Sequence, residues 1–93
     1  MPTLHCVIHG RVQGVGFRYF AQRCAEELGL NGWVRNLRGG LVETEVEGSR
    51  EVLERYLSEM QSGPAHATVS RVDAEWFDIQ GAYSSFEIRA TEW

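Results

Sequence analysis

Lysine is absent from this 93-residue sequence, so all nine basic side chains are arginines. Only two cysteines are present, Cys6 and Cys24, and their number and spacing suit neither a disulfide framework nor a metal site. No apolar run approaches the roughly 20 residues that a membrane-spanning helix requires. The first residues also lack the basic segment and the long apolar stretch of a signal peptide, so we expect a cytoplasmic protein.

Acidic residues are missing from the start of the chain, because no carboxylate side chain occurs between Met1 and Ala25. Residues 1–40 contain five arginines and two glutamates, a net charge of +3, whereas residues 41–93 carry a net charge of −7. The overall charge of −4 and the isoelectric point near 5.3 argue against general nucleic-acid binding, which requires a basic surface. We therefore expect any anionic ligand to bind to the first half of the chain.

What is present indicates one globular domain over residues 1–93, because 43% of the residues are hydrophobic and 24% are charged. Helical spacing of apolar residues predicts a helix over residues 17–28, ended by Gly29, and a second from Ser49 to Gly63-Pro64. The segments with strand-like alternation are residues 3–9, 32–38, 41–47, 71–76 and 86–89. This β-α-β-β-α-β order with an extra final strand predicts an α+β, ferredoxin-like sandwich, with both helices on one face of a mostly antiparallel sheet and the other face open.

The dipeptide Gly39-Gly40 suits a two-residue hairpin turn, and this turn would set the register of its two strands. The resulting pairs are Leu37 with Val42, Arg35 with Thr44 and Trp33 with Val46, on the face that meets the helices. Asn36 and Val34, opposite Glu43 and Glu45, would then face away from the helices, unless a bulge inverts the pattern. We expect a core that contains Trp33, Trp76 and the two cysteines as free thiols, although a disulfide between the cysteines is not excluded.

The segment Gly10–Arg18 leads from a strand into a helix and contains Gly14 and Gly16. Such a junction offers free backbone N–H groups and the positive end of the helix dipole, which together attract anions. Neither a Walker loop nor the dinucleotide-binding fingerprint fits the sequence. Arg18 is unusual because a cation in the first helical turn opposes the dipole, at a cost of about 0.3–1 kcal/mol. A bound anion would offset that cost, and a guanidinium can contact two phosphate oxygens at once.

Three segments of the sequence resemble the acylphosphatase family: GRVQGVGFR at residues 10–18, GWVRN at 32–36 and GGLVE at 39–43. The resemblance spans almost the whole chain, and Gly39-Gly40 replaces an Asp-Gly that is frequent there. It implies a hydrolase without metal or cofactor that converts acyl phosphates into a carboxylate and inorganic phosphate.

The resemblance also assigns site residues. It implies that Arg18 holds the phosphate together with the backbone amides of the loop, and that Asn36 orients the attacking water. The residues whose amides take part are Gln13, Gly14, Val15, Gly16, Phe17 and Arg18. The same resemblance gives residues 90–93 no role. We expect a monomer that acts on a small-molecule acyl phosphate, with inorganic phosphate as product and sulfate as its mimic.

Two other functions remain open at this point. One is a non-catalytic phosphate-binding module, which would need Arg18 and the loop but not Asn36. The other is binding of single-stranded RNA on the open sheet face, which the acidic composition and the absence of stacking aromatics there disfavour. Three further arginines are expected on the solvent side, where they would steer an anion without contacting it, and the three histidines share no metal-ligand spacing. These are Arg11, Arg35 and Arg38, and His5, His9 and His66.

Overall fold

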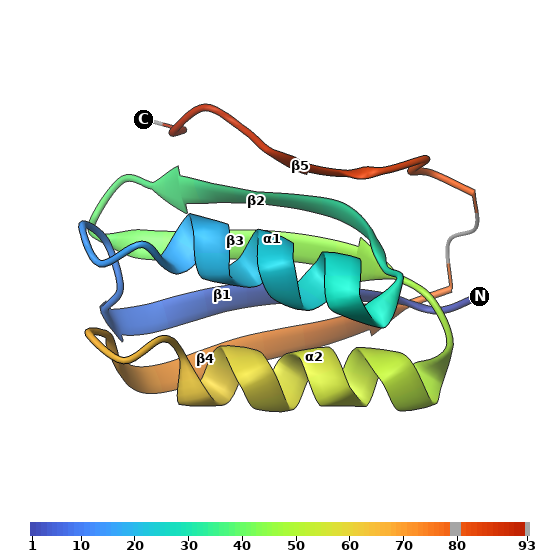
Figure 1. The fold of residues 1–93 in the computed structure, drawn as a ribbon, viewed down its shortest axis with the longest axis horizontal. Helices are drawn as coiled ribbons and strands as arrows, with labels where there is room; N and C mark the ends of the chain where they lie inside the picture. Colours follow the sequence, from blue (N-terminus) through green and yellow to red (C-terminus); the bar gives the residue numbers. More distant parts are fainter. Residues whose placement is uncertain (79–80, 93) are drawn as a thin grey trace.

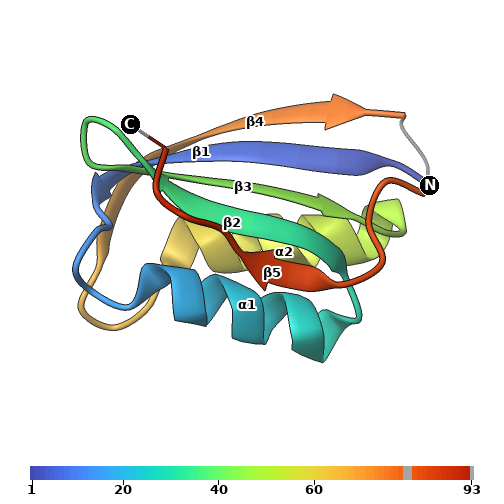
Figure 2. The ribbon, with the colours of Figure 1, turned by 90° about the horizontal axis from the view of Figure 1, so that it is seen from above.

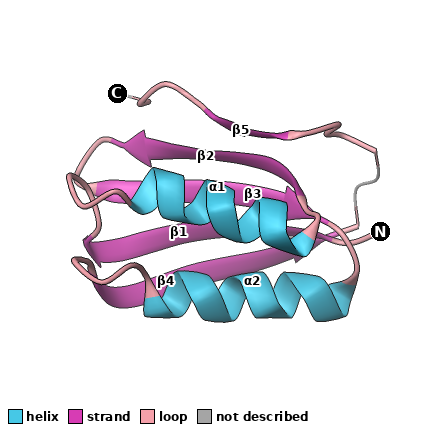
Figure 3. Ribbon diagram, in the orientation of Figure 1, coloured by secondary structure: helices cyan, strands magenta, loops and turns pink. Residues whose placement is uncertain are grey.

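The computed structural model describes residues 1–78 and 81–92, and its elements follow the predicted order (Figure 1). They are β1 (Thr3–Arg11), α1 (Phe17–Leu28), β2 (Asn31–Leu37), β3 (Leu41–Glu47), α2 (Arg50–Ser62), β4 (Thr68–Phe77) and β5 (Phe86–Ile88). The strands form one sheet in the order β4-β1-β3-β2-β5, in which only the β2–β5 pair is parallel. Both helices lie on one face of this sheet and leave the other face uncovered (Figures 2 and 3). The predicted ferredoxin-like arrangement is confirmed.

The core lies between the sheet and the two helices. Its side chains come from alternate positions of the central strands and from the inner faces of the helices, as the periodicity predicts. They include Leu4, Cys6 and Ile8 of β1, Val42 and Val46 of β3, Phe17, Ala21 and Ala25 of α1, and Leu53, Tyr56 and Met60 of α2. Both cysteines are buried free thiols, as expected, and burial raises the pKa of Cys6 to about 12. Trp76 packs against this core, beneath the guanidinium of Arg50.

The register of the β2–β3 hairpin differs from the prediction by one residue. Leu37 pairs with Leu41, so the connection contains Arg38 as well as the two glycines. Asn36 consequently pairs with the buried Val42 and lies on the helix-facing side of the sheet, not on the open side. The prediction assumed a two-residue turn, and a slip of one residue moves every side chain to the other face.

Trp33 is likewise on the open face, which corrects its predicted place in the core. It is nevertheless only 6% exposed, because two guanidinium groups, of Arg35 and Arg89, lie 4.9 and 4.8 Å from its ring centre. Its indole N–H donates to the hydroxyl of Tyr83. The ring of Trp33 is therefore covered rather than presented to a ligand.

Charged side chains occupy much of the rest of the open face. Glu43 accepts hydrogen bonds from His5 and Arg35, each 2.7 Å long. Burial pushes the pKa of Glu43 upward, but these two hydrogen bonds outweigh it and hold the pKa below its usual value.

None of the helices in the described part of the chain is long and apolar enough to cross a membrane.

Candidate functional site

The connection between β1 and α1 has the backbone geometry of an anion-binding loop. Gly14 and Gly16 have φ angles of 73° and 76°, in the left-handed region that favours glycine. A Cβ added at either position would meet no atom within 4 Å, so the backbone angle, not lack of space, requires glycine there. The first helical hydrogen bond runs from the Phe20 N–H to the Gly16 carbonyl. Within the described residues, the N–H groups of residues 13–18 donate to no protein acceptor.

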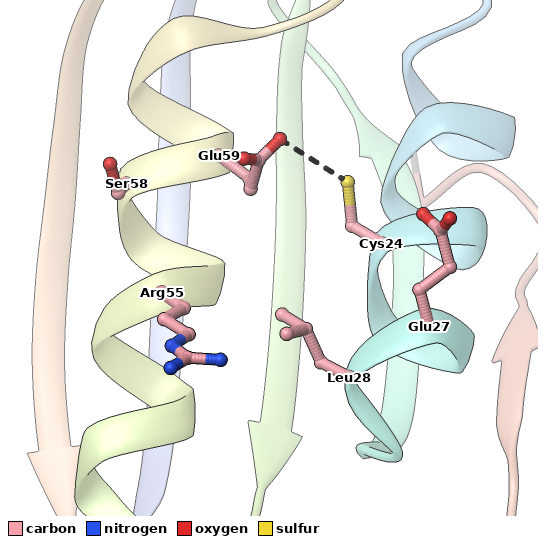
Figure 4. Close-up of a pocket in the computed structure, with 6 residues that line it drawn as sticks. All are labelled: Cys24, Glu27, Leu28, Arg55, Ser58 and Glu59. Carbon is pink, nitrogen blue, oxygen red and sulfur yellow. Dashed lines mark hydrogen bonds between the residues drawn. The ribbon is translucent and has the colours of Figure 1, made fainter.

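Arg18 lies in the first turn of α1, which contains no acidic residue. Its side chain is half-buried, and it forms no hydrogen bond or ion pair with any residue that the structure describes. Cys24 points from α1 toward α2, and Glu27 lines the same pocket between the two helices (Figure 4). With about 100° of rotation per residue, Arg18 projects from the side opposite Glu27, where α1 packs on β2 and β5. Arg18 therefore lies on the side of α1 away from α2.

Asn36 lies one residue before the end of β2, at the end of the sheet from which the loop emerges. The corrected register directs its side chain to the same face of the sheet as α1. Its carboxamide has no hydrogen-bond partner in the part of the chain that is described. Its backbone carbonyl accepts a 2.9 Å hydrogen bond from the N–H of Glu92. The side chain is therefore free to bind a small ligand while its backbone is fixed.

Gln13 has a side-chain contact that the sequence analysis missed, since it considered only the backbone of this residue. Its Nε2 donates to the carbonyls of Leu37 and Leu41, at 2.8 Å each. This amide joins the loop to both strands of the hairpin, next to Asn36. The only sequence signal was a polar residue at the start of a glycine-containing loop, and the incorrect register concealed its partners.

The other predicted polar residues divide into two groups. Arg11 and Arg38 are exposed at the same end of the molecule as the loop and have no ion-pair partner among the described residues. Arg35, in contrast, lies on the open face and pairs with Glu43 and Glu92. Two histidines, His5 and His9, contact the carboxylates of Glu43 and Asp73. In residues 1–78 and 81–92, no group of three or more His, Cys, Asp or Glu is placed to hold a metal ion.

A cavity of about 310 Å³ lies between α1 and α2, away from the loop (Figure 4). Its lining residues are Cys24, Glu27, Leu28, Arg55, Ser58 and Glu59. The Cys24 thiol donates to Glu59, and burial, with the charge of Glu59, raises the pKa of Cys24 to about 11. Because two carboxylates outnumber one guanidinium here, the cavity does not suit an anion. The loop end of the molecule is the better candidate.

Comparisons with known proteins identify the family of the chain. A family model described as Acylphosphatase matches residues 4–88. A protein of Roseiflexus sp. named acylphosphatase is 46% identical over 88 residues, which cover 95% of each chain. Another, from Thermus thermophilus, is 47% identical over 81 residues, 87% of this chain and 92% of that one. The crystal structure of acylphosphatase from Bacillus subtilis superposes with a TM-score of 0.92 at 32% identity, over 96% of this chain and 99% of that one.

Proposed function

The chain belongs to the acylphosphatase family and is a hydrolase of acyl phosphates, for which we propose that Arg18 and Asn36 are the catalytic residues. The observation that carries this assignment is the unpaired guanidinium of Arg18 beside a row of backbone N–H groups without protein acceptors. A phosphate dianion supplies the acceptors that both lack. The amides of Gln13, Gly14, Val15, Gly16, Phe17 and Arg18 then surround the phosphate, and the Arg18 fork contacts two of its oxygens.

Phosphoryl transfer depends mainly on positioning and on stabilising charge at the equatorial oxygens of phosphorus. Arg18 and the loop amides act on that charge, because they are already oriented before the reaction begins. The leaving carboxylate is stable as an anion, so it departs without a general acid.

Asn36 orients the attacking water. Its carboxamide can hold a water molecule by a hydrogen bond, in line with the leaving carboxylate, but it is too weak a base to deprotonate it. The water oxygen forms the new bond to phosphorus as the bond to the acyl oxygen breaks. The proton of the water passes late to the phosphate itself, so the products are a carboxylate and inorganic phosphate.

We extend the proposal to the protein as it works in the cell. Residues 1–93 act as one catalytic unit, a cytoplasmic monomer that requires no metal or cofactor. Its partner is a small acyl phosphate and not a nucleic acid, because the open sheet face carries the carboxylates of Glu43, Glu45 and Asp73 and the ring of Trp33 is covered.

The assignment is tested by hydrolysis of benzoyl phosphate in the presence of EDTA. The unmodified protein turns over without metal. Arg18→Ala loses both inhibition by inorganic phosphate and turnover, the latter by about 10²-fold or more, since it removes a main source of charge stabilisation. Asn36→Ala loses turnover to a similar extent but still binds inorganic phosphate.

Matched controls are Arg23→Ala, an exposed arginine farther along α1, and Asn31→Ala, at the opposite end of β2. Both retain turnover. Full activity of either catalytic variant refutes the role given to that residue. Tight phosphate binding by a protein without any turnover would indicate the non-catalytic module instead, and loss of activity on adding EDTA would refute metal independence.

A further inference from the structure

The side chain of Gln13 uses its entire donor capacity within the protein. A carboxamide has two N–H groups, and those of Gln13 reach the carbonyls of Leu37 and Leu41 at 2.8 Å. Neither donor is left for a phosphate oxygen. The side chain is therefore not a further phosphate ligand, although its own backbone N–H belongs to the loop.

The two acceptors occupy a particular place in the sheet. Leu37 and Leu41 form the last pair of the β2–β3 ladder, beyond which the chain turns through residues 38–40. Leu37 also follows Asn36 directly. One amide group thus connects the start of the loop, which carries the phosphate-binding N–H groups, to the strand end that carries the Asn36 carboxamide.

The rest of the loop is held independently of this amide. Val12, immediately before Gln13, is 1% exposed and belongs to the core, as does Phe17 at the start of α1. Gln13 itself is only half-buried. Removal of its two hydrogen bonds leaves both anchors of the loop in place, and it releases the one connection from this loop to the hairpin that the described side chains provide.

We propose that Gln13 is a positioning residue, which sets the distance between the phosphate-binding loop and Asn36 and hence between the phosphorus atom and the attacking water. This inference rests on the roles proposed above for Arg18 and Asn36. Nucleophilic attack is sensitive to displacements of about 1 Å, whereas phosphate affinity depends on the loop and Arg18 alone. Removal of the Gln13 amide therefore lowers kcat and leaves the affinity for phosphate almost unchanged.

The test compares Gln13→Met, which keeps the side-chain length but removes both donors, with Gln61→Met, the same change at an exposed position of α2. We expect kcat for benzoyl phosphate to fall about tenfold to a hundredfold in Gln13→Met. The inhibition constant for inorganic phosphate and the increase in melting temperature on adding phosphate should stay within about twofold of the unmodified protein. Gln61→Met should match the unmodified protein in all three measurements.

A parallel fall in kcat and in phosphate affinity would overturn the inference, because it would mean that Gln13 merely maintains the shape of the loop. Unchanged kcat would overturn it too. If Gln13→Met does not fold, Gln13→Asn decides by the same criteria, because its shorter amide cannot reach both carbonyls. An inactive unmodified protein would instead refute the proposed function, so the two failures are distinguishable.

Discussion

Arg18 carries an electrostatic cost in the protein without ligand. It places a full positive charge where the N-terminal end of α1 already has a partial positive charge, and no acid lies in that turn. No hydrogen bond or ion pair with a described residue compensates for this arrangement. The residue therefore opposes folding slightly and favours anion binding.

Arg18→Gln should accordingly stabilise the protein in a buffer without phosphate or sulfate, by about 0.3–1 kcal/mol in the free energy of unfolding. Added inorganic phosphate should stabilise the unmodified protein by mass action but not this variant. Urea denaturation with and without phosphate measures both effects. Arg23→Gln, beyond the first turn, serves as the control and should retain the stabilisation by phosphate. A less stable Arg18→Gln in the absence of anions would contradict this interpretation.

The pattern of the sequence and the family resemblance single out the glycine loop, Arg18 and Asn36 as candidate site residues, and their role stays a prediction. The surroundings of these residues could not all be predicted. The predicted orientation of Asn36 is wrong for two reasons. Both faces of β2 carry a mixture of polar and apolar side chains, so the pattern does not identify the buried face. The predicted register also depended on the length of the glycine-containing turn. Gly39 and Gly40 both adopt φ angles near 85° to 88°, which are compatible with more than one loop length. Gln13 was missed for the same reason, since its partners depend on that register.

At the scale of elements, the segment after β5 has a place in the sheet. Beyond Ile88 the chain continues along β2: the Arg89 N–H donates to Val34, the Glu92 N–H to Asn36, and the Arg38 N–H to Glu92. The sequence pattern predicts a strand only as far as residue 89, because residues 90–92 do not alternate between apolar and polar side chains. These backbone hydrogen bonds hold the end of β2 from the side opposite β3.

Glu92→Pro removes the N–H that donates to the Asn36 carbonyl. We expect a loss of about 0.5–1.5 kcal/mol in the free energy of unfolding, the typical value of one hydrogen bond, together with a lower kcat. Denaturation and benzoyl phosphate assays measure the two. Glu92→Ala is the matched control: it keeps the backbone donor and loses only a 3.5 Å ion pair with Arg35, so it should differ by less than about 0.5 kcal/mol. Equal effects of the two substitutions would show that the side chain, not the backbone contact, matters.

The helices were predicted more accurately than the strands for a physical reason. Gly29 adopts a left-handed conformation at the end of α1, and the N–H of Leu30 bonds back to Ala25. Such a helix end depends on residues that are adjacent in the sequence, so it can be predicted from the sequence alone. The length of β4, in contrast, is set by its pairing with β1, including a bulge between His9 and Gly10. This pairing is not local, and the mostly polar residues at the start of β4 do not reveal it in the sequence.

For the molecule as a whole, unpaired positive charge lies at the end that carries the loop between β1 and α1. Arg11 and Arg38 are exposed there without ion-pair partners among the described residues, whereas Arg50 and Arg55 on α2 pair with glutamates. The net charge is −4, so these arginines create a local field that opposes the overall repulsion of an anionic substrate.

The double variant Arg11→Gln/Arg38→Gln should lower kcat/KM about twofold to tenfold at low ionic strength and leave kcat unchanged. At 1 M salt, where the screening length is about 3 Å, the difference should disappear. Arg55→Gln is the control and should have no effect at either ionic strength. A difference that persists at 1 M salt would mean that these arginines contact the substrate instead of attracting it.

Met1 and Glu92 lie at opposite ends of the sheet (Figure 1), and this has a practical consequence. Pro2 bonds to Gly48, far from the loop, whereas Glu92 lies against Asn36. An affinity tag or fusion partner joined ahead of Met1 is therefore remote from the reaction. The same addition at the other end follows Glu92, whose N–H bonds to the backbone carbonyl of Asn36, so surface immobilisation or labelling through the N-terminus should preserve turnover.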